Sequence, residues 1–441
     1  MRVAVIGIGH VGLVTAACLA RWGHEVCGMD DDNDKVAVLQ DGGIPFHEPG
    51  LAELVAEGRS AGRLSFSNDI RDALFEAEVA FVCVGTPSLP GGAPNLAYVE
   101  RVGQVAALHA RRDLVLAEKS TVPANTGMRL SYVIEREQAR ARNGARIEVA
   151  SNPEFLREGQ AVADTLRPDR VVVGTSSERA RAALREVYAP LLSEHDCPYI
   201  ETDLVTAELI KHASNAFLAT RISFINAVAR LCELVGADVQ AVAEGMGADH
   251  RIGPHFLNAG LGYGGSCFPK DVDAFLHLAR SVGYHFNLLE QVRRVNDEQR
   301  EHVLDKIRSE LWHLEGKTVA LLGAAFKPGT DDLRQAPALW LAERLLAEGA
   351  TVRIYDPVAL SKVKEWLPDV ACIDDPLGAC LDAHAAVICT EWPQITALTG
   401  AELATVLAYP IVIDGRNALD PEGMRAAGIR YHGLGRPPVI P

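Results

Sequence analysis

Apolar residues in the first part of the chain form short continuous runs, separated by longer stretches with helical periodicity. Such runs of Val, Ile and Leu are typical of strands buried in a parallel sheet. They occur at residues 2–6, 24–29, 79–84, 114–118, 147–150 and 171–174. A helical pattern at 13–22 separates the first two runs. Strands that alternate with helices predict a doubly wound parallel sheet in this part of the chain.

The pattern changes in the middle of the chain. Residues 204–234 contain no Pro or Gly and have helical periodicity. A single helix of that length would span about 46 Å, more than one compact domain needs. We therefore expect a long central helix of the kind that often carries a dimer interface, although two helices with a bend would give the same pattern.

Strand-like runs return at 317–323, 351–355, 385–390 and 411–413, and they repeat the N-terminal architecture. The predicted fold is α/β, with two Rossmann-like doubly wound domains joined by the central helix. The expected domains are an N-terminal NAD-binding domain (1–200), a central helical domain with the dimer interface (201–300) and a C-terminal domain (301–441).

Composition and charge exclude several classes of protein. Hydrophobic residues make up 48% of the chain and charged residues 23%, so the chain can bury a core and is not intrinsically disordered. The net charge of −15 argues against a nucleic-acid-binding or anionic-membrane surface. Residues 3–20 could pass for a signal peptide, but their glycines and His10 favour a strand, a turn and a helix. With no long apolar stretch elsewhere, we expect no membrane span and a cytoplasmic protein.

The cysteines and histidines show no metal-binding pattern. The chain has nine cysteines, an odd number, and none of them form a CxxC pair. None of the 14 histidines belongs to an HExxH motif. We expect most of the cysteines to pack as small hydrophobic side chains in a reducing compartment, and we expect no metal site.

A glycine motif follows the first predicted strand. Gly7 permits a tight turn, Gly9 lets the backbone approach a pyrophosphate, and Gly12 lets the next helix pack on the strand. Asp30 lies 18 residues beyond Gly12, at the end of the second predicted strand. Its carboxylate can bind both ribose hydroxyls of NAD and would repel the extra phosphate of NADP. The motif predicts NAD binding, although a tight turn without a ligand would look similar.

A second glycine-rich segment, 260–271, carries a cysteine. Such a loop lets the backbone wrap closely round a ligand, and it contains Cys267, Lys270 and Asp271. If a helix begins near Pro269, Cys267 sits at its N-terminal end, where the helix dipole favours a thiolate. We favour a nucleophilic Cys267 over an inert buried one.

Further polar residues have weaker signals. Lys211 and Asn215 are four residues apart on one predicted helix face and could together hold a developing alkoxide, but this motif alone favours a solvated helix face. Glu154 follows a strand, where it could act as an acid or base or simply as a first-turn acid. Thr86 and Thr121 also lie at strand ends, next to prolines that are common in ordinary loops.

Together these segments resemble the UDP-glucose/GDP-mannose dehydrogenase family almost from end to end. The matching segments are GxGxxG at 7–12, GTP at 85–87, STVP at 120–123, NPEFLREG at 152–159, GYGGSCFPKD at 262–271, AFKPGTDDLR at 325–334, TEWP at 390–393 and DGRN at 414–417. The resemblance implies an oxidation of UDP-glucose to UDP-glucuronate in two steps, with two NAD reduced. His10 stands where the family usually has Tyr.

The resemblance also implies roles for these residues. Cys267 would form a thiohemiacetal and then a thioester, and Asp271 would help to position the base water. Lys211 and Asn215 would stabilise the oxyanions, and Glu154 would serve the hydrolysis water. Thr121 would position a water or the cofactor. The implied cofactor residues are Gly7, Gly9, Val11, Gly12, Asp30, Lys35, Thr86, Thr121, Glu158, Lys270 and Arg334. The implied substrate residues are Glu154, Phe155, Leu156, Lys211, Asn215, Arg251, Tyr263, Gly264, Lys327 and Arg416, with Arg251 acting across a homodimer and the nucleotide bound by the C-terminal domain.

Two other functions stay open on the sequence. The same machinery could oxidise TDP-glucose, GDP-mannose or a UDP-N-acetylhexosamine, because few contacts set such a preference. A non-catalytic NAD-binding sensor is also possible, and it would need neither Cys267 nor Lys211.

Overall fold

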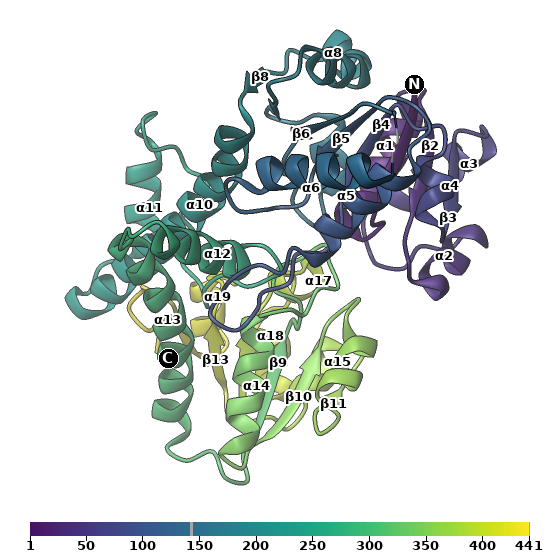
Figure 1. Ribbon diagram of the computed structural model, residues 1–441. Helices are drawn as coiled ribbons and strands as arrows, with labels where there is room; N and C mark the ends of the chain where they lie inside the picture. Colours follow the sequence, from purple (N-terminus) through teal and green to yellow (C-terminus); the bar gives the residue numbers. More distant parts are fainter. Residues whose placement is uncertain (142–143, 441) are drawn as a thin grey trace. The chain divides into compact units, whose positions relative to one another are not determined.

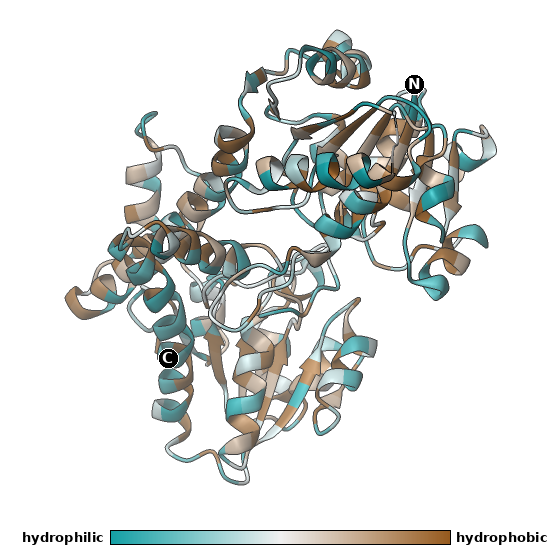
Figure 2. Cartoon of the chain, viewed as in Figure 1, coloured by the Kyte–Doolittle hydropathy of each residue, from teal (hydrophilic) through white to brown (hydrophobic). Residues whose placement is uncertain are grey.

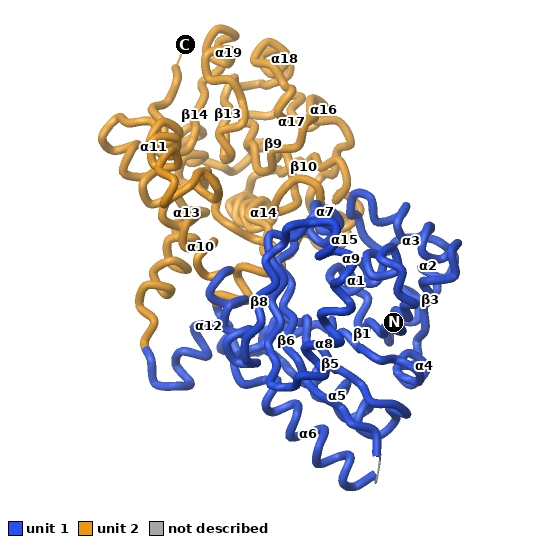
Figure 3. The backbone as a smooth tube through the Cα atoms, turned by 90° about the horizontal axis from the view of Figure 1, so that it is seen from above, with its two compact units in different colours: residues 1–214, 273–284 blue, residues 215–272, 285–441 orange. Residues whose placement is uncertain are grey.

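The computed structural model describes residues 1–141 and 144–440, which form an α/β chain with two separate sheets (Figure 1). Pro441, the last residue of the predicted segment 301–441, lies outside the described residues. The chain divides into two compact units (Figure 3). Unit 1 consists of residues 1–214 and 273–284, and unit 2 of residues 215–272 and 285–441. The division into segments 1–200, 201–300 and 301–441 stays a prediction.

The sheet of unit 1 has the strand order β3-β2-β1-β4-β5-β6-β7-β8. Neighbouring strands are parallel, except that β6 and β7 meet in an antiparallel pair between Ser151 and Gly174. The strands are β1 (Arg2–Ile6), β2 (Glu25–Met29), β3 (Leu64–Ser67), β4 (Val79–Val82), β5 (Leu114–Glu118), β6 (Ile147–Ser151), β7 (Val171–Gly174) and β8 (Tyr199–Thr202).

Helices cover both faces of this sheet, which explains why its inner strands are mostly apolar. Val3 and Val5 of β1 pack in one core cluster with α1, while Ala4 and Ile6 pack in another with α5 and α6. Inner strands such as β4 and β7 are accordingly hydrophobic (Figure 2). The helices are α1 (His10–Arg21), α2 (Asn33–Gln40), α3 (Leu51–Ser60), α4 (Ile70–Leu74), α5 (Ala97–His109), α6 (Thr126–Ala141), α7 (Ala161–Leu166), α8 (Glu178–Val187) and α9 (Ala189–Glu194).

Unit 2 contains a smaller parallel sheet with the order β11-β10-β9-β12-β13-β14. Its strands are β9 (Thr318–Leu322), β10 (Thr351–Tyr355), β11 (Ala371–Cys372), β12 (Ala385–Ile388), β13 (Ile411–Asp414) and β14 (Arg430–Gly433). Val319 and Leu321 of β9 face one core cluster, and Ala320 and Leu322 face another. The flanking helices are α14 (Pro337–Ala347), α15 (Leu360–Trp366), α16 (Pro376–Cys380), α17 (Pro393–Thr396), α18 (Gly400–Val406) and α19 (Pro421–Ala426). Both predicted Rossmann-like folds are confirmed.

The predicted central helix is one continuous element, α10 (Leu204–Val235), so the alternative of two bent helices is excluded. It contains residues of both units, as does α12 (Phe268–Ser281). The remaining helices are α11 (Val239–Gly247) and α13 (Asn287–Leu311). Across residues 1–141 and 144–440, no helix has the length and apolar character needed to cross a membrane.

Candidate active site

The glycine motif forms the turn between β1 and α1. Gly7 has a φ of 90°, and its N–H donates to the Met29 carbonyl at 2.7 Å. A Cβ at Gly12 would lie 1.8 Å from the Gly7 oxygen, so only glycine fits there. A Cβ at Gly9 would meet nothing within 4 Å, which leaves space beside the first turn of α1, where Val11 lies. These residues therefore fit a pyrophosphate group bound at a helix N-terminus.

Asp30 is held beside this turn at the end of β2. Its Oδ2 accepts from the Ile8 N–H and from Lys35 Nζ, each at 3.0 Å. Its Oδ1 accepts from the Asp32 N–H at 3.2 Å. The structure thus brings the predicted residues Asp30 and Lys35 together as an ion pair next to the glycine turn.

His10 and Glu48 form a contact that sequence reasoning missed. The His10 Nε2 lies 2.6 Å from Glu48 Oε2, and the imidazole stacks on the Phe46 ring with 4.5 Å between centroids. Glu48 also accepts the backbone N–H of Gly159 at 2.6 Å, one residue after the predicted cofactor residue Glu158. Glu48 therefore joins the end of the NPEFLREG segment to the glycine turn, and no motif marks it in the sequence.

Thr86 and Thr121 lie at the carboxyl ends of β4 and β5, which are adjacent strands. Thr86 Oγ1 donates to the Thr121 carbonyl at 3.0 Å, and Ser120 Oγ donates to the Val84 carbonyl at 2.7 Å. The two predicted threonines are thus brought together at the edge of the sheet where ligands bind in open α/β folds.

Glu154 and Lys211 form a buried ion pair in unit 1. Lys211 Nζ lies 2.9 Å from Glu154 Oε1, and the two residues are 3% and 8% exposed. Glu154 Oε2 accepts the Leu156 N–H at 2.7 Å, so both carboxylate oxygens are held. The pair brings together two predicted catalytic residues that lie 57 positions apart in the sequence.

Phe155 lies beneath two cations. Lys211 Nζ is 5.4 Å from the centre of its ring, and the Arg170 guanidinium is 3.6 Å from it. Arg170 was not predicted from the sequence. Burial lowers its pKa from the ordinary value, against the opposing effect of nearby Asp169 and Glu154. Arg170 and Lys211 together fix the ring of a predicted substrate residue.

In unit 2, Cys267 immediately precedes α12, as the sequence predicts. The Asp271 N–H donates to the Cys267 carbonyl at 2.8 Å, which is the first bond of the helix. Ser266 Oγ lies 3.4 Å from Cys267 Sγ. Cys267 is partly exposed, as are Cys27, Cys83 and Cys372, whereas the other five cysteines are buried. The helix N-terminus favours a thiolate at this position.

Asp271 is a buried acid with both carboxylate oxygens hydrogen-bonded. It is 1% exposed, and its Oδ2 accepts from Asn215 Nδ2 at 2.6 Å while its Oδ1 accepts from Lys270 Nζ at 2.7 Å. Asn215 belongs to α10, one turn beyond Lys211. A buried carboxylate with a hydrogen bond to each oxygen can hold a water or act as a base without moving.

The glycine loop before Cys267 is fastened to its surroundings. The Tyr263 N–H donates to Asn296 Oδ1 at 2.7 Å, and the Gly265 N–H donates to the Arg334 carbonyl at 2.9 Å. A Cβ at Gly264 would lie 2.3 Å from the Gln335 carbonyl oxygen. The glycines are therefore required by close backbone packing, and this packing brings Tyr263, Gly264 and Arg334 together.

Two other predicted substrate residues gather round Phe326. The Arg416 guanidinium donates to the Phe326 carbonyl at 3.0 Å and to the Cys389 carbonyl at 2.8 Å, and Lys327 Nζ lies 5.5 Å from the centre of the Phe326 ring. Arg251 is different. It is exposed, and within the described part of unit 2 its guanidinium pairs with Asp249, which is not a predicted site residue.

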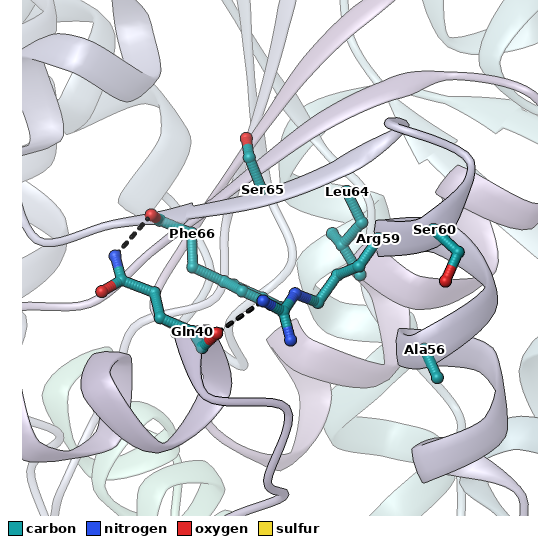
Figure 4. Close-up of a pocket in the computed structure, with 7 residues that line it drawn as sticks. All are labelled: Gln40, Ala56, Arg59, Ser60, Leu64, Ser65 and Phe66. Carbon is teal, nitrogen blue, oxygen red and sulfur yellow. Dashed lines mark hydrogen bonds between the residues drawn. The ribbon is translucent and has the colours of Figure 1, made fainter.

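A shallow pocket of about 580 Å³ lies at the β3 edge of unit 1 and includes no predicted site residue (Figure 4). It is lined by Gln40, Ala56, Arg59, Ser60, Leu64, Ser65 and Phe66. Its cation, Arg59, already donates to the Gln40 carbonyl. Over the described ranges, no group of three or more His, Cys, Asp or Glu side chains is arranged to hold a metal ion.

Comparisons with known proteins cover nearly the whole chain. Three domains of the UDP-glucose/GDP-mannose dehydrogenase family match it: the NAD binding domain at residues 1–192, the central domain at 205–298 and the UDP binding domain at 320–421. UDP-glucose 6-dehydrogenase TuaD of Bacillus subtilis (strain 168) is 43% identical over 439 residues, which are 99% of this chain and 94% of that protein. UDP-glucose 6-dehydrogenase of Pseudomonas aeruginosa is 44% identical over 445 residues, covering 99% and 98%. The solved UDP-glucose dehydrogenase of Pyrobaculum islandicum is 37% identical, with a TM-score of 0.90 over 98% of this chain and 97% of that chain.

Proposed function

Because the chain belongs to the UDP-glucose/GDP-mannose dehydrogenase family, we propose that it is an NAD-dependent enzyme that oxidises UDP-glucose to UDP-glucuronate in two steps. The observation that carries the proposal is the buried Asp271 carboxylate, which lies in the helical turn after Cys267 and accepts a hydrogen bond from Asn215 of α10. A sensor that only binds NAD has no use for a fixed carboxylate beside a partly exposed thiol at a helix N-terminus.

The first oxidation converts the primary alcohol of the sugar into an aldehyde, with loss of a proton and a hydride. Lys211 and Asn215 stabilise the alkoxide that forms as the proton leaves, since an ammonium and an amide donor both favour an oxyanion. The buried Glu154 carboxylate holds the Lys211 ammonium in place at 2.9 Å.

The second oxidation is covalent. Cys267 Sγ attacks the aldehyde carbon, the C–S bond forms, and the thiol proton passes to the aldehyde oxygen to give a thiohemiacetal. The thiohemiacetal then loses its hydroxyl proton and a second hydride to become a thioester. Water then attacks the thioester carbon, the C–S bond breaks, and the thiol and a carboxylate are released. Asp271 positions a water that acts as the base, and Glu154 assists the water that hydrolyses the thioester.

NAD supplies the hydride acceptor in both oxidations when it is bound. We assign its pyrophosphate to the turn of Gly7, Gly9 and Gly12 and its ribose to Asp30. Further cofactor residues in this proposal are Val11, Lys35, Thr86, Thr121, Glu158, Lys270 and Arg334.

The substrate residues in this proposal are those that the family resemblance implies: Glu154, Phe155, Leu156, Lys211, Asn215, Arg251, Tyr263, Gly264, Lys327 and Arg416. The match of the UDP binding domain to residues 320–421 supports the assignment of the nucleotide half to the C-terminal part of the chain.

The proposal includes a homodimer through α10 and a cytoplasmic location. Phe217, Phe224 and Leu231 repeat every seven residues on α10 and are 62%, 52% and 58% exposed. Residues at this spacing lie on one side of a helix, and a stripe of three large apolar side chains favours pairing with a second copy. Arg251 is exposed and could then act across the interface.

The test is the rate of NADH formation with NAD and each of UDP-glucose, TDP-glucose, GDP-mannose and UDP-N-acetylglucosamine. We expect the highest kcat/KM with UDP-glucose. A higher kcat/KM with another sugar nucleotide would identify that compound as the substrate in place of UDP-glucose. The absence of NADH formation with all four compounds would contradict the proposed enzymatic activity.

A further inference from the structure

The loop between β5 and α6 carries Thr121, and its shape is set by side chains that come from α10. The loop begins after Glu118 and ends where α6 starts at Thr126. The Thr121 carbonyl accepts the Thr86 hydroxyl at 3.0 Å, which ties this loop to the neighbouring loop after β4. The residues that hold this loop therefore also position Thr86 and Thr121, the two threonines that we assign to NAD binding.

Glu208 of α10 caps the N-terminus of α6 from outside. Its Oε2 accepts the Asn125 N–H and its Oε1 accepts the Gly127 N–H, both at 2.7 Å. Asn125 has a φ of 75°, a left-handed conformation that is costly for a residue other than glycine. The Glu208 carboxylate offsets that cost, because it satisfies backbone donors that the first turn of a helix leaves unpaired.

His212, one turn along α10, fixes the same loop at a second point. Its Nε2 lies 2.9 Å from the Val122 carbonyl, so Nε2 carries the proton and donates. The imidazole is 1% exposed, and its ring packs near Phe275 with 5.8 Å between centroids. Glu208 and His212, which flank Lys211 in the sequence, thus both form hydrogen bonds with the loop. The Lys211 ammonium pairs instead with Glu154.

A second buried acid, Glu118, lies against this contact. A Cβ at Gly127 would be 2.9 Å from Glu118 Oε2 and 3.3 Å from Glu208 Oε1, so the two carboxyl groups approach the same point. In the described part of the chain, neither oxygen of Glu118 has a hydrogen-bond partner. Burial, and then the charge of Glu208, raise the pKa of Glu118 well above its usual value. Burial also raises the pKa of Glu208, to about 7, although its hydrogen bonds with the Gly127 and Asn125 N–H groups lower it. Above that pH, Glu208 is the anion that holds the loop.

We propose that Glu208 and His212 are positioning residues, which hold the Thr121 loop in the conformation that binds NAD. This inference rests on the proposed function, because the assignment of Thr121 to NAD does so. Neither residue is placed against the substrate or the cofactor. They act through the loop, and their loss should weaken NAD binding without removing the chemistry of the sugar.

The test is NAD titration of the full chain without any sugar nucleotide, comparing wild type with Glu208→Gln and His212→Leu. Glu208→Gln keeps the shape but loses the charge and one acceptor. Charge-assisted hydrogen bonds are about twice as strong as neutral ones, so we expect its Kd for NAD to rise roughly tenfold. His212→Leu tests the second contact if Glu208→Gln does not fold. Glu135→Gln, the same change at an exposed site on α6, is the matched control and should bind NAD like wild type.

Kinetics and hydrogen exchange separate positioning from general damage. For Glu208→Gln we expect the KM for NAD to rise with the Kd, while kcat and the KM for UDP-glucose stay within about threefold. The amides of Asn125 and Gly127 should exchange faster than in wild type. Faster exchange with an unchanged Kd for NAD would overturn the inference, as would an equal loss in kcat. A wild-type protein that binds NAD but forms no NADH would contradict the proposed function alone, because the binding comparison needs no turnover.

Discussion

The side-chain amide of Asn215 donates a hydrogen bond of 2.6 Å to the Oδ2 atom of Asp271, a carboxylate that is 1% exposed. The bond joins α10 to the first turn of α12, the helix that follows Cys267. Lys270 holds the other oxygen of the same carboxylate. The acid is therefore fixed in direction and keeps its charge compensated, which suits a group that must orient water repeatedly.

Replacing Asp271 with Asn should abolish most of the activity. The substitution keeps the size of the side chain but removes the acceptor of the Asn215 amide or the partner of Lys270. We expect kcat to fall by about 10²- to 10³-fold, as when one preorganised group is lost from an active site, with a smaller change in the KM for UDP-glucose. Glu244→Gln, an exposed site on α11, should leave both unchanged. A kcat within tenfold of wild type would remove Asp271 from the mechanism.

Thiol alkylation should be selective for Cys267. Burial raises the pKa of Cys83 and of Cys389 to about 12, so both stay protonated at neutral pH. Cys267 is partly exposed at a helix N-terminus, and the thiolate is the reactive form. With iodoacetamide at pH 7.5, peptide mass spectrometry should find Cys267 modified at least about 100-fold faster than Cys83. Labelling of Cys83 first would contradict the assignment of the nucleophile.

Two glycines of the β1–α1 turn should respond differently to alanine. A Cβ at Gly12 would overlap the Gly7 oxygen, so Gly12→Ala should lower the free energy of unfolding by about 1–3 kcal/mol or more. A Cβ at Gly9 would meet no protein atom, so Gly9→Ala should keep the wild-type unfolding midpoint. It should nevertheless raise the Kd for NAD about tenfold, because the methyl group fills the space of the pyrophosphate. Thermal unfolding and NAD titration measure the two effects, and a Gly9→Ala variant that binds NAD normally would contradict this site.

The strands that the sequence predicted best are those buried on both faces. The expected runs at 2–6, 114–118 and 351–355 coincide with β1, β5 and β10. The edge strands β3 and β8 were missed, because one face or both contact water and the apolar signal is weak. The Asn215 and Lys211 helix was predicted in one piece because no residue in it breaks a helix.

The sequence predicted the segments that contribute to the site, but it did not predict which side chains of these segments contact one another. Motifs marked Glu154, Lys211, Asn215 and Asp271 one by one, but the pairs they form need the tertiary fold. Glu48 and Glu208 were given no role from the sequence, since each accepts hydrogen bonds from backbone N–H groups far away in the sequence. Such contacts depend on where two elements meet, which local periodicity does not encode.

Glu118 should make the stability of the protein depend on pH. Its folded pKa is raised, so the folded chain binds more protons than the unfolded chain above the usual Glu pKa of 4.5. The free energy of unfolding then falls as pH rises, by up to about 1.4 kcal/mol per pH unit for one proton. Glu118→Gln cannot titrate. In urea unfolding at pH 5, 6, 7 and 8, its stability relative to wild type should rise with pH, whereas that of Glu135→Gln should stay constant. A difference in the free energy of unfolding between Glu118→Gln and wild type that does not change with pH would contradict a buried, neutral Glu118.

The exposed stripe on α10 should decide the oligomeric state. A charge at Phe224 would lie in the middle of the proposed interface between Phe217 and Leu231. We expect Phe224→Glu to convert a dimer into a monomer in light scattering after size-exclusion chromatography, while Leu381→Glu, at another exposed apolar site, stays dimeric. A wild-type monomer, or a dimer that survives Phe224→Glu, would contradict an interface on this stripe.

The number of NADH formed per UDP-glucose consumed tests the central claim most directly, because only the covalent route through Cys267 carries one sugar through both oxidations. For wild type we predict two NADH per UDP-glucose with UDP-glucuronate as the product, and for Cys267→Ser no carboxylate. One NADH per sugar with an aldehyde product, or full carboxylate formation by Cys267→Ser, would contradict the account.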